Sequence, residues 1–105
     1  MTELLAVKIN QSWHEAIAPR DLYEASRRSW KLSEERARKV QIVLSLADGR
    51  VVEVYRVQSW HRSSDEGRME FVGHLAEDTL REVWLDRPSR DIARNTGPVR
   101  YIKLD

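Results

Sequence analysis

The amino-acid sequence predicts an α+β fold: a small, curved, mainly antiparallel sheet of about five strands, with a curvature compatible with a barrel, and two helices. Two runs rich in β-branched residues flank Asp48-Gly49, two helix-like segments lie at 19–28 and 76–85, and shorter apolar runs occur near both ends of the chain. The resulting order, β-α-β-β-β-α-β, is typical of α+β domains.

A hairpin over residues 40–60 is the longest predicted element. Asp48-Gly49 is expected to form its turn, because both central residues of a type I′ turn need positive φ. The first arm has one apolar face, formed by Val40, Ile42, Leu44 and Leu46. The second arm is apolar on two faces, with Val52, Val54 and Trp60 on one and Val51, Tyr55 and Val57 on the other. A strand without a polar face is expected inside a sheet.

The elements before the hairpin are a strand at 4–9 and a helix at 19–28. Pro19 suits the first helical turn, where its missing N–H costs nothing. One face of this helix carries Leu22, Ala25, Ser26 and Ser29. Ser33 is expected to cap one further helical turn.

After the hairpin, the sequence predicts a polar loop, a third meander strand at 68–72 that Gly73-His74 ends, and a helix at 76–85. Its expected buried stripe consists of Leu80, Val83 and Trp84. Pro88 prevents extension of the helix. Residues 86–96 are expected to be irregular, with one turn around Ile92, and the last strand spans 99–104.

The totals predict one globular domain, residues 1–105, with 41% hydrophobic and 33% charged residues. The absence of cysteine excludes disulfides, thiolate metal sites and a cysteine nucleophile. No apolar run reaches the roughly 20 residues of a membrane helix, and the N-terminus lacks the pattern of a signal peptide. We therefore expect a cytoplasmic protein with no membrane partner.

The net charge of +1 is unevenly distributed. Residues 20–39 carry seven basic and four acidic residues, residues 64–86 carry two and seven, and residues 87–105 carry five and two. Arginine dominates the basic segments, and its planar fork suits phosphates and base edges. A GC-rich coding sequence would explain the same preference.

The first candidate binding set is Tyr23, Arg27, Arg28 and Trp30, followed by further basic residues up to Lys39. Basic residues interleaved with aromatics suit nucleic acid, because phosphates need positive charge and bases need flat faces. The alternative is a helix whose aromatic residues pack in the core while Glu24, Glu34 and Glu35 balance the charge.

Two further sets lie later in the chain. Trp60, His61 and Arg62 end the long hairpin strand, where functional side chains are common, and His61 is the best candidate for a titrating group. Arg94, Asn95 and Arg100, with Arg87 and Arg90, form a basic cluster that suits phosphates, carboxylates or an acidic protein surface. The alternatives are a core tryptophan beside an exposed histidine, and a solvated loop.

Catalysis has little support in the sequence. There is no Gly-x-Ser-x-Gly elbow, the four glycines are isolated, and no carboxylate cluster suits a nuclease metal. No cofactor or metal is therefore expected, and a binding protein is favoured over an enzyme. An enzyme would need His61 or His14 beside a carboxylate in a pocket.

Four segments carry a resemblance to a known family: 22–27 with Trp30, 53–55 with Trp60, 69–73, and 97–102. They are similar to small bacterial and phage domains of unassigned function, with Tyr-Glu-Ala-Thr-Arg near the start, Arg-Trp-Glu-Phe-x-Gly in the middle and Asn-Pro-Ile-Arg-Tyr at the end. Here Ser26 replaces Thr, Met69 replaces Trp, and Thr96-Gly97 is inserted. The resemblance implies no activity. The small curved sheet also loosely resembles PUA-like modules, which hold a base or nucleotide in a cleft.

The leading hypothesis is a non-catalytic module that binds nucleic acid or a nucleotide. Arg27, Arg28, Arg94 and Arg100 would contact phosphate, and Tyr23, Trp30 or Trp60 would stack on a base. The alternative is a protein-interaction domain, such as a phage-encoded inhibitor or a partner subunit, that binds a host protein through the acidic segment or exposed aromatics. Exposed strand edges also allow a homodimer.

Overall fold

The computed structural model describes residues 2–28, 30–92 and 98–104. Its strands are β1 (Thr2–Lys8), β2 (Val40–Ala47), β3 (Arg50–Arg62), β4 (Met69–Leu75) and β5 (Val99–Leu104). Its helices are α1 (Pro19–Arg27), α2 (Glu34–Ala37), α3 (Asp78–Trp84) and the short 3-10 helix η1 (Ser89–Asp91). The predicted α+β class and element order are confirmed.

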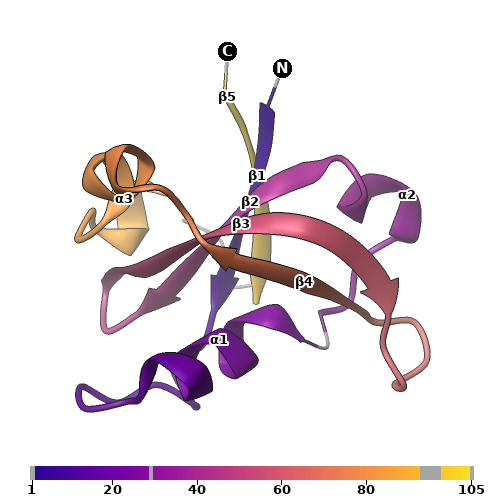
Figure 1. Cartoon of the computed structure of the whole chain (residues 1–105), viewed down its shortest axis with the longest axis horizontal. Coiled ribbons are helices and arrows are strands. Elements are labelled where there is room, and N and C mark those ends of the chain that lie inside the picture. Colours follow the sequence, from indigo (N-terminus) through magenta and orange to yellow (C-terminus); the bar gives the residue numbers. More distant parts are fainter. Residues whose placement is uncertain (1, 29, 93–97, 105) are drawn as a thin grey trace.

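The five strands form one open sheet in the order β4-β3-β2-β1-β5. β1 and β2 are parallel, joined by a crossover through α1 and α2, and all other neighbours are antiparallel. The crossover places β1 beside β2. The last strand, β5, pairs with the other side of β1 and so forms the edge of the sheet opposite β4. The sheet therefore does not close into a barrel, and that part of the prediction is wrong. The N- and C-terminal ends lie side by side (Figure 1).

The hairpin prediction is confirmed at its turn. Asp48 and Gly49 both have positive φ, 53° and 76°. β2 and β3 pair antiparallel on either side of them. β3 lies between β2 and β4, as expected for a strand without a polar face.

The faces of the hairpin arms differ from simple alternation because the pairing register shifts at three places. At each shift, one residue has no partner on the neighbouring strand. These residues are Gln41 in β2 and Val52 and Gln58 in β3. Each extra residue in a β-bulge exchanges the two faces for everything beyond it. Val40 therefore lies on the opposite face from Ile42, and the predicted single apolar face of the first arm is wrong.

Both faces of the sheet are covered. One face packs under α1 and α2, around Leu22, Ala37, Tyr55, Trp60 and Phe71. The other packs against α3, around Leu44, Val54, Ala76 and Trp84. In Figure 1, α1 and α3 lie on opposite sides of the sheet. Within the described part of the chain, no helix is both long and apolar enough to cross a membrane.

The first two helices follow the sequence closely. α1 begins at Pro19, and the Ser33 side chain accepts a hydrogen bond from the Arg36 N–H at the start of α2. α3 is shorter than predicted, because the Ala76 N–H still donates to the Val54 carbonyl and extends the sheet. Val83 is 49% exposed, so its place in the buried stripe is wrong.

β4 extends through Gly73 and His74 to Leu75, so the prediction that these two residues end it is also wrong. The bulge at Gln58 brings the β3 backbone close to Gly73. A Cβ at Gly73 would lie 2.2 Å from the Arg56 carbonyl oxygen. Glycine therefore occupies this position because the neighbouring backbone leaves no room for a side chain, and the strand continues through it.

Candidate functional site

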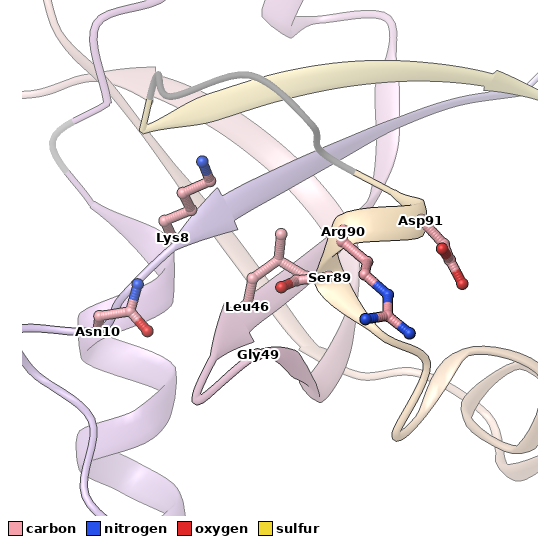
Figure 2. Close-up of a pocket in the computed structure, with 7 residues that line it drawn as sticks. All are labelled: Lys8, Asn10, Leu46, Gly49, Ser89, Arg90 and Asp91. Carbon is pink, nitrogen blue, oxygen red and sulfur yellow. The ribbon is translucent and has the colours of Figure 1, made fainter.

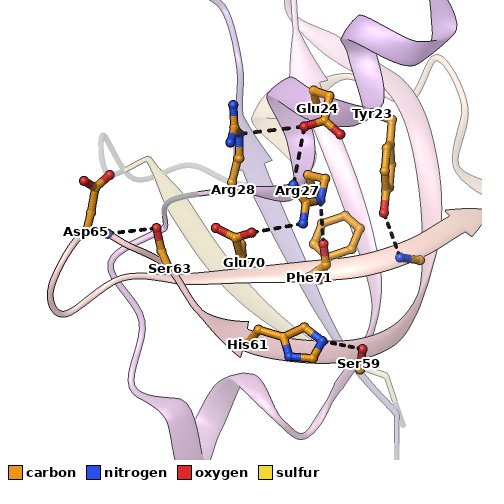
Figure 3. A network of polar contacts seen from close by, with 11 residues as sticks. Tyr23, Glu24, Arg27, Arg28, Ser59, His61, Ser63, Asp65, Glu70 and Phe71 are labelled. Carbon is orange, nitrogen blue, oxygen red and sulfur yellow. Dashed lines mark hydrogen bonds and ion pairs between the residues drawn. The ribbon is translucent and has the colours of Figure 1, made fainter.

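Three of the predicted ligand-binding residues join α1 to the outer edge of β4. The Arg27 Nε donates to the Phe71 carbonyl at 2.9 Å, and Arg27 Nη2 lies 3.0 Å from Glu70 Oε2 (Figure 3). The Tyr23 hydroxyl accepts a hydrogen bond from the Gly73 N–H at 2.9 Å. These contacts lie on the side of β4 that has no neighbouring strand.

Trp30 completes this edge. Its backbone N–H and carbonyl exchange hydrogen bonds of 3.0 and 2.8 Å with Met69, and its indole N–H donates to the Ser26 carbonyl at 2.9 Å. Four outward-facing backbone groups of β4 thus have partners from the segment 23–30: the Met69 N–H and carbonyl, the Phe71 carbonyl and the Gly73 N–H. Natural proteins cover exposed strand edges in this way, because an open edge invites unwanted pairing.

Two tyrosine hydroxyls provide a matched test of these contacts. The Tyr101 hydroxyl is buried, and within the described residues it has no hydrogen-bond partner. Tyr23→Phe should lower the free energy of unfolding by about 1 kcal/mol, because it removes the bond to Gly73. Tyr101→Phe should leave stability unchanged or increase it, because it removes an unsatisfied buried group. Urea denaturation of both variants measures the difference, and equal losses would contradict it.

Trp60 lies in the core rather than on the surface. Its side chain is 4% exposed, its ring meets Phe71 edge-on with centroids 5.5 Å apart, and its indole N–H donates to the Val40 carbonyl at 3.1 Å. No face of the ring is open to a base. The prediction that Trp60 stacks on a ligand is therefore wrong for this conformation, and the core alternative holds.

His61 and Arg62 are exposed at the end of β3. The His61 Nε2 lies 2.8 Å from the Ser59 hydroxyl, and Arg62 Nε lies 2.6 Å from Glu34 Oε1. The hydrogen bond and charge of Arg62 lower the pKa of the Glu34 carboxyl. Figure 3 shows His61 on β3, apart from the Arg27 contacts. Arg100 is exposed on β5, at the opposite end of the strand order, whereas Arg94 and Asn95 lie outside the described residues.

A buried polar cluster joins α1 to the sheet. The Ser26 hydroxyl donates to the Leu22 carbonyl at 2.8 Å and accepts from the Ser45 hydroxyl at 2.7 Å, and both serines are fully buried. Burial, with the nearby Glu53 carboxylate, strongly raises the pKa of Tyr55, while hydrogen bonding to Ser26 opposes the rise. The Tyr55 phenol is therefore neutral at physiological pH, and this cluster serves packing.

A groove runs along the end of β1, where two hollows share Lys8 and Asn10. The first, about 660 Å³, has Lys8 and Asn10 on one side and Ser89, Arg90 and Asp91 on the other, with Leu46 and Gly49 between them (Figure 2). The second, about 460 Å³, is lined by Lys8, Ile9, Asn10, Gln11, Ser12, Ala25, Arg28, Trp30 and Pro98. We call the two hollows together the β1-end groove.

The described lining of the β1-end groove holds more cations than carboxylates. The second hollow has Lys8 and Arg28 but no carboxylate among its described lining residues, and the first has only Asp91. Arg28 is 58% exposed, and its ion pair with Glu24 is long, at 3.8 Å. Arg36, Arg38, Arg50, Arg56, Arg62 and Arg81 all lie within 3.4 Å of a carboxylate. Arg28 is therefore less closely paired than those six arginines.

A third hollow, about 730 Å³, lies between α1 and the loop at 63–67. It contains His14 together with Asp21, Glu24, Asp65 and Glu70. No hydrogen bond or ion pair joins His14 to these carboxylates in the described part of the chain. Among those residues there is also no group of three or more His, Asp or Glu side chains placed to hold a metal ion.

Sequence reasoning identified Arg28 and Trp30 in the β1-end groove but missed Lys8 and Asn10. Both follow directly from a buried apolar strand, and residues at strand ends are common in binding sites. Their position at the end of a predicted strand was the signal in the sequence that could have identified Lys8 and Asn10. No family model, curated protein or solved structure matches this chain, so the resemblance to small bacterial and phage domains stays a prediction.

Proposed function

We propose that the protein is a non-catalytic module that binds nucleic acid or a nucleotide in the β1-end groove. Lys8 and Arg28 would contact phosphate, with Arg90 at the far end. Trp30 would offer an aromatic surface to a base. The observation that carries the proposal is the second hollow, in which two cationic side chains and an aromatic side chain occur without a carboxylate among the described lining residues.

The chemistry of the other lining residues supports the same class of ligand. Asn10, Gln11 and Ser12 carry side-chain donors and acceptors of the kind that bond sugar hydroxyls, base edges and phosphate oxygens. Trp30 is partly exposed, and its backbone is fixed by two hydrogen bonds to Met69. A ring held in place loses little conformational freedom when a base stacks on it.

Titration with short single-stranded DNA or RNA, and with mononucleotides, tests the proposal through tryptophan fluorescence. Trp60 and Trp84 are buried, so quenching would arise from the partly exposed Trp13 or Trp30, and Trp30→Phe would identify which. Arg28→Gln is expected to weaken binding about tenfold, because it removes a charge-assisted hydrogen bond. It should also lower the salt slope by about 0.7 for a single strand.

Arg62→Gln is the matched control. It removes the same charge from an arginine outside the groove, 82% exposed and paired with Glu34. Affinity should be nearly unchanged at about 200 mM salt, where weak non-specific attraction is small. Equal losses in the two variants would indicate diffuse electrostatic attraction, and the absence of saturable binding at about 50 mM salt would refute the proposal.

A further inference from the structure

The two edge strands of the sheet, β4 and β5, differ in how far their outward backbone groups are hydrogen-bonded. At β4, the outward-facing groups of Met69, Phe71 and Gly73 are engaged by Trp30, Arg27 and Tyr23. At β5, no such cover occurs among the described residues. An edge with unpaired backbone groups is a template for another strand. Within the described residues, the chain therefore covers much of the β4 edge and leaves the β5 edge open.

The register identifies which groups of β5 point outward. The Lys8 N–H donates to the Pro98 carbonyl, so Ala6–Arg100 and Leu4–Ile102 are the next hydrogen-bonded pairs of this antiparallel ladder. Val99 and Tyr101 alternate with these residues, and their N–H and carbonyl groups face away from β1. No described residue bonds to them, so an added strand would find unpaired donors and acceptors along β5.

Arg100 gives this edge an exposed positive charge. Arg100 is exposed and has no ion-pair partner in the described part of the chain. Arg36 places its guanidinium 3.9 Å from the Tyr101 ring centroid, and it is already paired with the Glu3 carboxylate at 3.4 Å. Ile102 and Val99 are partly buried and offer apolar contact on the two faces. A complementary strand would carry a carboxylate opposite Arg100 and apolar residues beside it.

We propose that the β5 edge binds an extended acidic segment of a partner protein as a sixth strand. A second copy of this chain fits less well, because antiparallel self-pairing centred on Tyr101 would place each Arg100 opposite Ile102, where no carboxylate can pair with it. Main-chain hydrogen bonds give such strand addition its affinity, and the side chains opposite Arg100 and Tyr101 give it specificity.

The test uses a labelled octapeptide that alternates glutamate and valine, with a lysine–valine octapeptide as its counterpart. The acidic peptide should bind saturably, measured by fluorescence anisotropy. Bound acidic peptide should also slow amide hydrogen exchange at Val99 and Tyr101 on β5. Exchange at Phe71 and Gly73 on β4, the opposite edge, should not change. Arg100→Glu should weaken the acidic peptide about tenfold and favour the lysine peptide. Arg28→Gln should leave peptide binding unchanged, which separates this site from the β1-end groove.

Val99→Pro isolates the backbone contribution. Val99 begins β5, where proline is tolerated, and the change removes one outward N–H without breaking a bond to β1. We expect about fivefold weaker peptide binding, since one hydrogen bond is lost, whereas Val99→Ala, which keeps the N–H and loses only part of the apolar contact, should weaken binding clearly less. If Val99→Pro does not fold, the backbone contribution is tested in the unchanged protein by whether the acidic peptide slows amide exchange at Val99 and Tyr101. Equal affinity for both peptides, or protection at Tyr101 that depends on protein concentration without peptide, would overturn the proposal.

Discussion

Trp60→Ala is expected to lower the free energy of unfolding by about 3–5 kcal/mol, the range for truncation of a large buried aromatic side chain. The indole is 4% exposed and packs edge-on against Phe71. Its loss leaves a cavity under α1 and also leaves the Val40 carbonyl, which accepts its N–H, without that partner. Urea denaturation followed by far-UV circular dichroism measures the change.

Trp60→Phe is the control, because it keeps an aromatic ring in the core and loses only the second ring and the bond to Val40. It should cost clearly less than the alanine variant. If Trp60 instead stacked on a ligand base, Trp60→Ala would reduce ligand binding more than stability. A Trp60→Ala variant that loses less than about 1 kcal/mol but no longer binds nucleic acid would restore that role and contradict the core assignment.

The fold was predictable where local signals were strong. Asp48-Gly49 determines its hairpin because a type I′ turn requires positive φ at both positions, and Pro19 marks the first turn of α1. Val99–Leu104 was recognised as a strand from its composition, but its place beside β1 was not. Strand order depends on contacts between distant segments, which the periodicity of one segment does not encode.

The faces of the hairpin were harder to predict than its existence. Gln41, Val52 and Gln58 look like ordinary members of alternating runs, yet each is the extra residue of a register shift. A shift of one residue moves every later side chain to the other face. Val40 was assigned to the wrong face for this reason. The partner strands determine the bulges, so a single sequence gives no sign of them.

The candidate site was predicted less well than the fold, because ligand binding and edge cover call for the same residue types. Tyr23, Arg27 and Trp30 have the polar groups and flat rings that nucleic acid needs. The same three residues hydrogen-bond to outward-facing backbone groups of β4, Trp30 through its own backbone. Only the position of β4 distinguishes the two uses. Arg28, which follows the last residue of α1, instead pairs with Glu24 at 3.8 Å and lines both the β1-end groove and the third hollow.

Gly73→Ala should be among the most damaging single-methyl changes in this chain, with an expected loss of about 3 kcal/mol in the free energy of unfolding. The new Cβ would lie 2.2 Å from the Arg56 carbonyl oxygen and 3.2 Å from the Val57 Cα, both of them backbone atoms. No side-chain rotation relieves such a contact. β4 would have to move away from β3 and toward α1, which would also distort the hydrogen bond from Gly73 to Tyr23.

Gly67→Ala provides the matched control for this loss. A Cβ at Gly67 would meet nothing within 4 Å, but its φ of +78° is one that alanine adopts only with strain. That strain is expected to cost about 1 kcal/mol. A larger loss at Gly73 than at Gly67, measured by urea denaturation, would show that close backbone approach dominates over conformational strain. If Gly73→Ala were as stable as the unchanged chain, β3 and β4 could not be held together at the Gln58 bulge as described, and the cover of the β4 edge by Tyr23 would lose its basis.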